Sequence, residues 1–97
     1  MNKIKLKNRS KIEIIADILE CIMNDGTLSS AKLMLKAFLT YKQTKEYLPF
    51  LLQNEFIKYG DKDRTLRITG KGLHFLEMYN RLPEFVERID RLRPIRT

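Results

Sequence analysis

Very few side chains in this sequence could carry catalytic or metal-binding chemistry. It contains a single histidine, His74, and a single cysteine, Cys21. A metal site built from His and Cys ligands, or a catalytic triad built on His, is therefore close to excluded, and no internal disulfide can form. Asp61 and Asp63 lie in a turn-rich segment and are typical of a hairpin tip rather than of an acid/base pair. Since no glycine-rich phosphate loop is present either, we expect no catalytic residue, no metal and no cofactor, and hence no enzyme.

The basic side chains indicate a different chemistry, the binding of a polyanion. The sequence has 19 Lys and Arg against 12 Asp and Glu, a net charge of +7 over 97 residues. Residues 1–10 carry +4, residues 26–75 carry +5 and residues 88–97 carry +3, whereas residues 11–25 and 76–87 are acidic. Basic stretches separated by acidic ones favour a face directed at a polyanion. A highly charged surface that keeps the protein soluble explains the same charges equally well.

Three groups of residues are candidates for contacts with DNA. The first group opens a predicted helix and comprises Tyr41, Lys42, Gln43 and Lys45. A glutamine amide can bond to a base edge, and lysines can meet phosphate or guanine. The second group lies in or beside a predicted hairpin and comprises Lys62, Arg64 and Arg67. The third begins a short helix and comprises Ser29, Ser30 and Lys32, where ordinary helix capping is an equally good interpretation.

Three helices are predicted to position these residues, over about 11–25, 30–37 and 41–53. Ser10 and Glu13 have the spacing of a capping box at the first helix, and Thr40 and Gln43 have it at the third. The apolar face of the first helix comprises Ile12, Ile15, Ile18, Leu19 and Ile22. That of the third comprises Tyr41, Thr44, Leu48, Leu51 and Leu52. Pro49 is expected to kink the third helix on the side away from the core.

A β-hairpin and a fourth helix are predicted to follow. The hairpin strands are residues 56–59 and 65–68, on either side of a charged turn. Thr69 caps the fourth helix, where Gly70 and Gly72 indicate close approach of another backbone and Leu73 and Leu76 face the domain. The short turn at Phe38 and Leu39 joins the second and third helices. This order predicts a mainly α fold with a small hairpin, a helix-turn-helix followed by a wing.

The C-terminal residues have the pattern of a coiled coil. Phe75, Tyr79, Leu82, Val86 and Ile89 are spaced 4-3-4-3. The pattern is short, and Pro83 kinks or restarts the helix. We expect a homodimer through this helix, supplemented by Ile14 and Cys21 as a second stripe on the first helix. The competing interpretation is that the C-terminal helix folds back on its own domain and gives a monomer.

Several motifs resemble those of small archaeal winged-helix proteins. The stretch 32–43, KLMLKAFLTYKQ, is similar to the family's R-I-M-Y-x-A-N-L-S-Y-K-Q-L. Residues 9–19 resemble its first helix, and residues 66–72 resemble its Y-x-L-T-x-K-G signature. Phe38 replaces an Asn of the family, Thr44 replaces a Leu, and Asn54-Glu55 replaces Lys-Gly. Because Glu disfavours positive φ, we expect Asn54 to adopt the left-handed conformation.

The resemblance implies a DNA-binding protein, either a transcriptional regulator or a chromatin-associated dimer. We expect a basic arm over 1–9, a winged helix-turn-helix domain over 10–76, and a C-terminal helix with a basic tail over 77–97. The expected partners are double-stranded DNA and a second copy of the chain. No apolar run reaches the roughly 18 residues of a membrane span, so a cytoplasmic, nucleoid-associated protein is expected. A winged-helix adaptor that binds proteins is the alternative, and RNA in place of DNA remains open.

Overall fold

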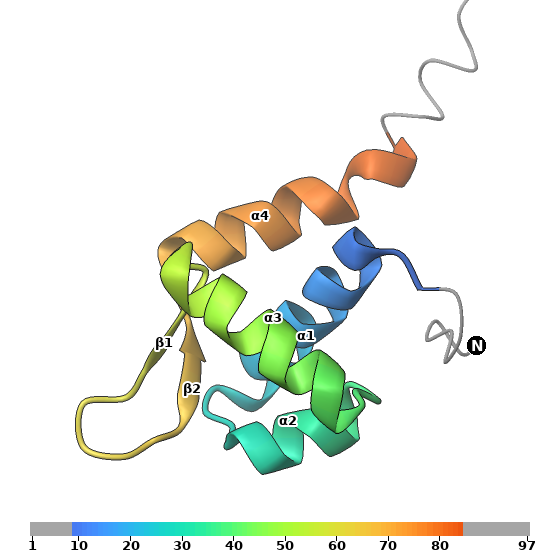
Figure 1. The fold of residues 1–97 in the computed structure, drawn as a ribbon. Helices are drawn as coiled ribbons and strands as arrows, with labels where there is room; N and C mark the ends of the chain where they lie inside the picture. Colours follow the sequence, from blue (N-terminus) through green and yellow to red (C-terminus); the bar gives the residue numbers. More distant parts are fainter. Residues whose placement is uncertain (1–8, 85–97) are drawn as a thin grey trace, which may run out of the picture.

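The computed structural model describes residues 9–84 and confirms the predicted order of elements (Figure 1). These are α1 (Lys11–Asp25), α2 (Ser30–Lys36), α3 (Tyr41–Gln53), β1 (Ile57–Tyr59), β2 (Leu66–Ile68) and α4 (Gly70–Asn80). In Figure 1, α4 lies above α1, and α3 lies above α2. The hairpin extends from the end of α3 at which β1 begins. The fold is therefore a helical core with one projecting hairpin.

Both predicted capping boxes are present. At α1, the backbone N–H of Glu13 donates to Ser10 Oγ at 3.1 Å, and the N–H of Ser10 donates to Glu13 Oε1 at 2.8 Å. At α3, Thr40 and Gln43 make the same reciprocal pair, at 3.0 Å for both bonds. Such caps satisfy N–H groups that have no partner within the helix. The start of α3 is therefore fixed by its own local sequence.

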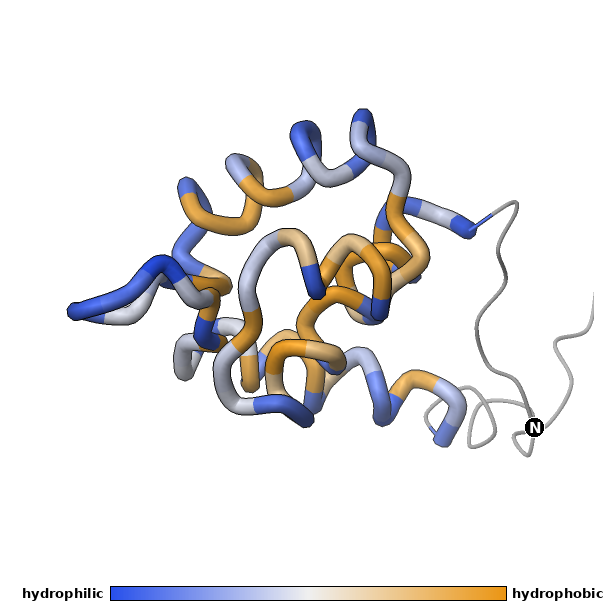
Figure 2. Tube along the Cα trace, turned by 90° about the horizontal axis from the view of Figure 1, so that it is seen from below, coloured by the Kyte–Doolittle hydropathy of each residue, from blue (hydrophilic) through white to orange (hydrophobic). Residues whose placement is uncertain are grey.

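The core lies where α1 meets the other elements. Its most deeply buried large side chains are Ile18, Leu19, Ile22, Leu33, Leu51, Ile57 and Leu66. Figure 2 shows hydrophobic segments at the centre and a hydrophilic hairpin loop at the edge. Burial of a Leu or Ile side chain contributes about 1.5–3 kcal/mol, so this cluster is the main source of stability. It brings together α1, α2, α3 and both strands.

The hairpin is tied to a segment far away in the sequence. β1 and β2 are antiparallel, with Ile57 opposite Ile68 and Tyr59 opposite Leu66. Leu28, between α1 and α2, adds an isolated bridge to Leu66: its N–H donates to Leu66 O at 3.2 Å, and the N–H of Leu66 donates to Leu28 O at 2.7 Å. The hairpin therefore pairs with a backbone segment outside its own two strands, and the sequence pattern did not predict this pairing.

One of the two predicted close backbone approaches is present. A Cβ atom on Gly72 would collide with the backbone carbonyl oxygen of Phe56, whereas one on Gly70 would meet nothing within 4 Å. The prediction was therefore right for Gly72 and wrong for Gly70. Thr69 strengthens the same junction, because its hydroxyl donates to Glu55 O at 2.6 Å and its N–H donates to Phe56 O at 3.1 Å.

Four predictions about which side chains face the core were wrong. Ile12, Tyr41 and Leu73 are exposed, whereas Ile14 is 4% exposed and belongs to the core. α1 contacts α2, β2 and α4, so Ile14 is covered within the chain and does not form a free second stripe. Tyr41 is the first residue of α3, where the helix extends past the core. Tyr47, which the periodicity did not select, is buried instead.

The C-terminal ends of α2 and α3 have the same hydrogen-bond geometry. After α2, the N–H of Phe38 donates to Leu35 O at 3.3 Å and that of Leu39 donates to Met34 O at 2.9 Å. After α3, Glu55 donates to Leu52 O at 3.1 Å and Phe56 to Leu51 O at 2.9 Å. Both pairs of bonds form a Schellman motif, which needs a left-handed residue just past the helix end.

Those left-handed residues are Phe38, with φ 55°, and Glu55, with φ 62°. The prediction that Asn54 would take this conformation was wrong, since its φ is −90°. The Asn54 side chain instead donates through Nδ2 to Phe50 O at 2.8 Å, and its own N–H donates to the same oxygen. Asn54 thus continues the helical geometry, and the reversal of the chain falls on Glu55.

Candidate nucleic-acid interface

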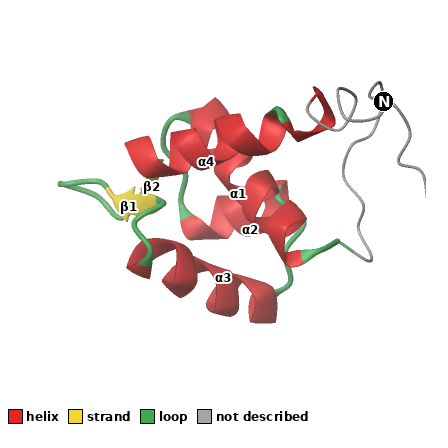
Figure 3. Cartoon of the chain, turned by 90° about the horizontal axis from the view of Figure 1, so that it is seen from above, coloured by secondary structure: helices red, strands yellow, loops and turns green. Residues whose placement is uncertain are grey.

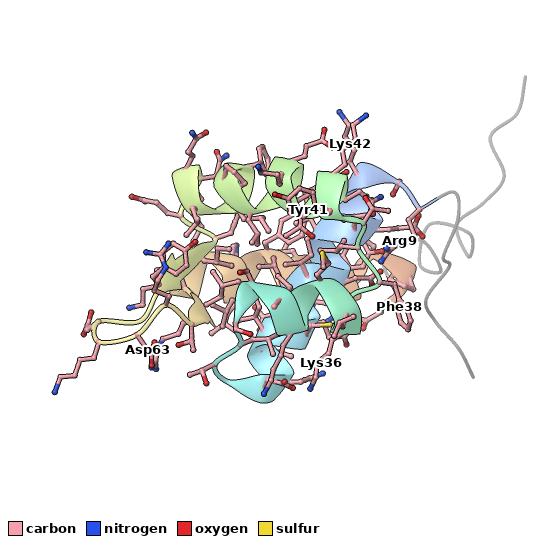
Figure 4. The ribbon with its side chains drawn as sticks, turned by 60° about the horizontal axis from the view of Figure 1, so that its bottom comes forward. Arg9, Lys36, Phe38, Tyr41, Lys42 and Asp63 are labelled. Carbon is pink, nitrogen blue, oxygen red and sulfur yellow. The ribbon has the colours of Figure 1, made fainter. Side chains whose placement is uncertain are left out.

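The first turns of α3 present an exposed basic and aromatic surface. Tyr41 is 67% exposed, and Lys45 Nζ lies 5.2 Å from the centre of its ring. Lys42 is also exposed and points away from the body of the domain (Figure 4). The structure therefore brings together three of the four residues predicted on this helix as accessible side chains.

Gln43, the fourth of these residues, is committed to the cap of α3. Its Oε1 accepts the N–H of Thr40 at 3.0 Å. Bidentate recognition of adenine needs both the oxygen and the NH2 group of a glutamine, so it would break this cap. The NH2 group alone can still donate to an acceptor such as guanine O6 or N7.

The hairpin loop is the second projecting feature, and it extends away from the helices (Figures 1 and 3). Lys62 and Arg64 are exposed there, and the Arg64 guanidinium lies 5.3 Å from the centre of the Tyr59 ring. Arg67, on β2, is half-buried, and its Nη2 lies 4.0 Å from Asp63 Oδ2. At this distance the ion pair holds the arginine only weakly.

Asp63 belongs to the turn of the hairpin. Its Oδ1 accepts the backbone N–H of Thr65 at 3.1 Å and also the Thr65 hydroxyl. These hydrogen bonds, the hydroxyl first, lower the pKa of Asp63 below its ordinary value. The carboxylate therefore shapes the loop, and it reduces the positive charge at the tip.

The third predicted group lies at the start of α2. Ser29 is the N-cap, and its Oγ accepts the N–H of Lys32 at 3.2 Å. The capping interpretation of Ser29 is therefore correct, while Ser30 and Lys32 are exposed. Ser29 and Lys32 line an open hollow of about 410 Å³ that extends to Thr65 of the hairpin. Lys36 also lines this hollow and pairs with Asp25 at 2.6 Å.

Acidic side chains gather elsewhere, between α1 and α4. Burial raises the pKa of Tyr79, and the carboxylates of Glu13, Asp17 and Glu20 raise it further. The same three residues line a small hollow of about 130 Å³ with Tyr79. Three carboxylates of α1 therefore face α4, while the fourth, Asp25, pairs with Lys36 and the lysines of α3 face solvent.

The residues predicted at a dimer interface have different environments. Ile14 is buried in the domain, and Cys21, Phe75 and Tyr79 are half-buried against the core. Burial raises the pKa of the Cys21 thiol, with the nearby carboxylates adding to the shift. Leu82 is 47% exposed. Val86 and Ile89, the last two residues of the predicted coiled coil, lie outside the described residues.

An exposed neighbour of Leu82 was missed by the sequence pattern. Met78 is 52% exposed and lies four residues before Leu82. α4 ends at Asn80, and helical conformation resumes over residues 82–84. The interruption lies close to Pro83, where the sequence predicts a kink or a restart. The exposed apolar side chains at the end of α4 and just beyond it are thus Met78 and Leu82 rather than Phe75 and Tyr79.

Arg9 was also missed, since the sequence showed it only as one charge of a basic arm. Its Nη1 donates to Asp17 Oδ2 and to Ala37 O, both at 2.9 Å, and its Nη2 donates to Phe38 O at 2.8 Å. Its side chain is only 5% exposed. The one signal for it in the sequence is that the resemblance to the archaeal family begins at this residue.

Over residues 9–84 we find no group of three or more His, Cys, Asp or Glu side chains suited to holding a metal ion. In the same part of the chain, no helix has both the length and the apolar character needed to cross a membrane.

Three helices followed by a hairpin, with the loop of the hairpin projecting and the third helix exposed, define the winged helix-turn-helix class (Figure 3). The family model described as winged helix-turn-helix matches residues 8–87, and this chain belongs to that family. The expected family and fold are therefore confirmed.

Two relatives come from the archaeon Methanocaldococcus jannaschii. Uncharacterized protein MJ0290 is 42% identical over 69 residues, which are 71% of this chain and 31% of the relative. Uncharacterized protein MJ0287 is 32% identical over 73 residues, 75% of this chain and 74% of the relative. The chain thus spans about a third of the length of the first relative and three quarters of the second.

A solved structure shares the fold. Sso10a-2, described as a DNA-binding protein from Sulfolobus solfataricus, superposes with a TM-score of 0.59 at 22% identity. The match covers 90% of this chain and all of the other. At this level of identity the similarity establishes the architecture.

Proposed function

We propose that this protein binds double-stranded DNA through α3 and the wing, as a transcriptional regulator or a chromatin-associated protein. The observation that carries the proposal is the exposed surface of Tyr41, Lys42 and Lys45 at the start of α3. In the winged helix-turn-helix class this end of the helix approaches the major groove. The description of the structural neighbour Sso10a-2 as DNA-binding supports the same function.

Charge supports binding that is mainly electrostatic. Residues 26–75, which include α3 and the wing, carry a net +5. The exposed Lys32, Lys62 and Arg64 extend the basic surface from α2 to the wing. Phosphate contacts of this kind give affinity and register, whereas sequence preference needs contacts with base edges. Because Oε1 of Gln43 already accepts the N–H of Thr40 in the cap of α3, we infer a modest sequence preference.

We further propose that the protein acts as a homodimer, with Met78 and Leu82 beginning the interface. Both are large exposed apolar side chains four residues apart, on either side of the interruption at Arg81, and Val86 and Ile89 continue the spacing in the sequence. Exposed apolar strips of this kind mark interaction surfaces. Two-fold symmetry would place two copies of α3 on DNA as paired half-sites.

The salt dependence of DNA binding tests the proposal. If about five phosphates are neutralised, log K falls with log salt at a slope of about −4 to −5. A gel-shift titration at two or more salt concentrations, on random and genomic duplexes, measures this slope. Lys42→Ala should lower the magnitude of the slope by about one, whereas Lys11→Ala, an exposed charge on α1, serves as the matched control. A flat response to salt, or no binding at low salt, would end the proposal.

A protein-binding adaptor is the second candidate, favoured by the exposed rings of Phe38 and Phe50. Contacts of that kind bury apolar surface and depend little on salt.

The remaining alternative is RNA binding. Titrating an RNA duplex of the same sequence beside the DNA tests it. Preference for the RNA would redirect the function to RNA binding.

A further inference from the structure

The Arg9 guanidinium joins two parts of the chain that are distant in sequence. It pairs with Asp17 on α1 and donates to the carbonyl oxygens of Ala37 and Phe38, all within 2.8–2.9 Å. Figure 4 shows Arg9 and Phe38 at the same end of the molecule. Charge-assisted bonds of this length are stronger than neutral ones, particularly where water is excluded.

The two carbonyls belong to the turn of the helix-turn-helix. Ala37 is the C-cap of α2 and Phe38 is its left-handed residue. Leu39 and the N-cap Thr40 follow, and α3 then begins at Tyr41. A phenylalanine in the left-handed conformation is strained, so the surrounding structure must hold it. Arg9 bonds to the carbonyl oxygen of this residue, where it opposes relaxation of the turn.

The charge of Arg9 also acts on a side chain of α3. Burial raises the pKa of Tyr47 and the charge of Glu46 adds to this shift, while the charge of Arg9 partly opposes it. Tyr47 is part of the core face of α3. Arg9 therefore bonds directly to α1 and to the turn, and its charge reaches the core face of α3.

We propose that Arg9 is a positioning residue for DNA binding, which holds the turn so that α3 presents Tyr41, Lys42 and Lys45 to the duplex. This inference rests on the proposed function. Arg9 itself does not contact phosphate, because its guanidinium is buried and bonded to protein oxygens. Its loss therefore reduces the fraction of molecules with a correctly placed α3, and the apparent Kd rises by the inverse of that fraction.

The salt slope separates positioning from direct contact. If Arg9→Ala leaves about one molecule in ten with α3 correctly placed, its Kd rises about tenfold. The slope of log K against log salt stays that of the unmodified protein, since no phosphate contact is lost. Lys11→Ala removes a nearby positive charge from the exposed side of α1 and should change Kd little. Lys42→Ala should instead lower the magnitude of the slope.

Arg9→Lys keeps the charge but cannot reach three oxygens in the geometry of a guanidinium. We expect it to bind DNA several-fold more weakly than the unmodified protein. Where Arg9→Ala does not fold, Arg9→Lys carries the comparison. The proposal would be overturned if Arg9→Lys bound DNA as tightly as the unmodified protein. It would also be overturned if Arg9→Ala lowered the magnitude of the slope of log K against log salt by about one.

Amide hydrogen exchange in the free protein gives an independent measurement. The N–H groups of Phe38 and Leu39 should exchange faster in Arg9→Ala, while those of Ile18 and Leu19 keep their protection. Unchanged exchange at Phe38 and Leu39 would overturn the positioning role without reference to DNA. A lack of DNA binding by the unmodified protein would instead end the proposed function, so the two failures are distinct.

Discussion

At the scale of single residues, the least expected feature is a pair of large side chains in left-handed conformations. Phe38 and Glu55 stand where the archaeal sequences that this chain resembles have Asn and Gly, the two residues best suited to positive φ. Both departures are visible in the sequence, but the left-handed conformation was predicted for Asn54 and not for Glu55. The Gly of the resembled sequences at the position of Glu55 was the signal for the correct residue, and Asn54 instead bonds through its side chain to Phe50 O.

We predict that Phe38→Asn and Glu55→Gly each stabilise the protein by about 0.5–1 kcal/mol. The left-handed conformation costs a residue with a Cβ about 1–2 kcal/mol, of which Asn relieves part, and glycine relieves it at some cost in chain entropy. Phe38 and Glu55 are exposed, so little packing is lost. Urea denaturation measures the change.

Glu46→Gly is the control for the glycine substitution, since Glu46 is an exposed residue inside α3. There the substitution should destabilise by roughly 0.5–1 kcal/mol. Equal effects at Glu46 and Glu55 would show that the backbone at Glu55 carries no strain.

The role of Arg9 could not be predicted from its residue type and position in the sequence. Its partners are an aspartate eight residues away and two backbone carbonyls nearly thirty residues away. A backbone carbonyl has no residue type, so no motif predicts it as a partner. Lys42 and Lys45 were predictable because they lie in the first turns of a capped helix, on the side opposite its apolar face. Tyr41 was assigned both to that apolar face and to the candidate contact surface, and its exposure agrees only with the second assignment.

At the scale of elements, the sequence predicted α3 well and its buried face less well. The capping box of Thr40 and Gln43 located the first residue, and the chain turns after Gln53 as expected. The helical period placed Tyr41 and Leu48 on one face, seven residues apart. The period does not say how far the core extends along the axis, and Tyr41 lies past its edge.

Gln43 has two roles that substitutions can separate. Gln43→Ala removes the side-chain acceptor of the cap and should cost about 0.5–1 kcal/mol of stability. Gln43→Glu keeps that acceptor, as in the usual capping box, but loses the NH2 donor. We therefore expect Gln43→Glu to fold as stably as the unmodified protein and to lose its preference among duplex sequences.

Thermal unfolding and competition between duplexes measure these two effects. The ratio of affinities for preferred and random DNA is the relevant quantity, because the added negative charge weakens all duplexes alike. A ratio unchanged in Gln43→Glu would contradict a base contact by the amide.

At the scale of the whole molecule, the order of elements followed from local signals, but contacts between distant segments did not. Caps and turn residues predicted the helices and the hairpin one by one. The bridge between Leu28 and Leu66 was missed because a single bridging residue has no periodicity. Burial of Ile14 was missed for a related reason: a second apolar stripe on a helix is compatible with a neighbour in the same chain or in another.

The proposed dimer gives a prediction at this scale. Met78→Asp combined with Leu82→Asp should shift the protein toward monomer, because two charges would be desolvated at the interface. Analytical ultracentrifugation at tens of micromolar measures the change. Leu73→Asp is the matched control, since Leu73 is exposed on a different side of α4.

Two results would contradict this interface. One is an unmodified protein that is monomeric at that concentration. The other is a dimer that persists in both Met78→Asp with Leu82→Asp and Val86→Asp with Ile89→Asp.

The bridge from Leu28 to Leu66 also constrains the order of events during folding. Two strands of three residues are too short to form a stable hairpin by themselves. Their third partner lies before α2, so pairing with it closes a loop that contains both α2 and α3, at an entropic cost that is met only when those helices are packed. We therefore expect the wing to form late, on a helix-turn-helix that has already assembled, and a hairpin peptide cut from this chain not to fold.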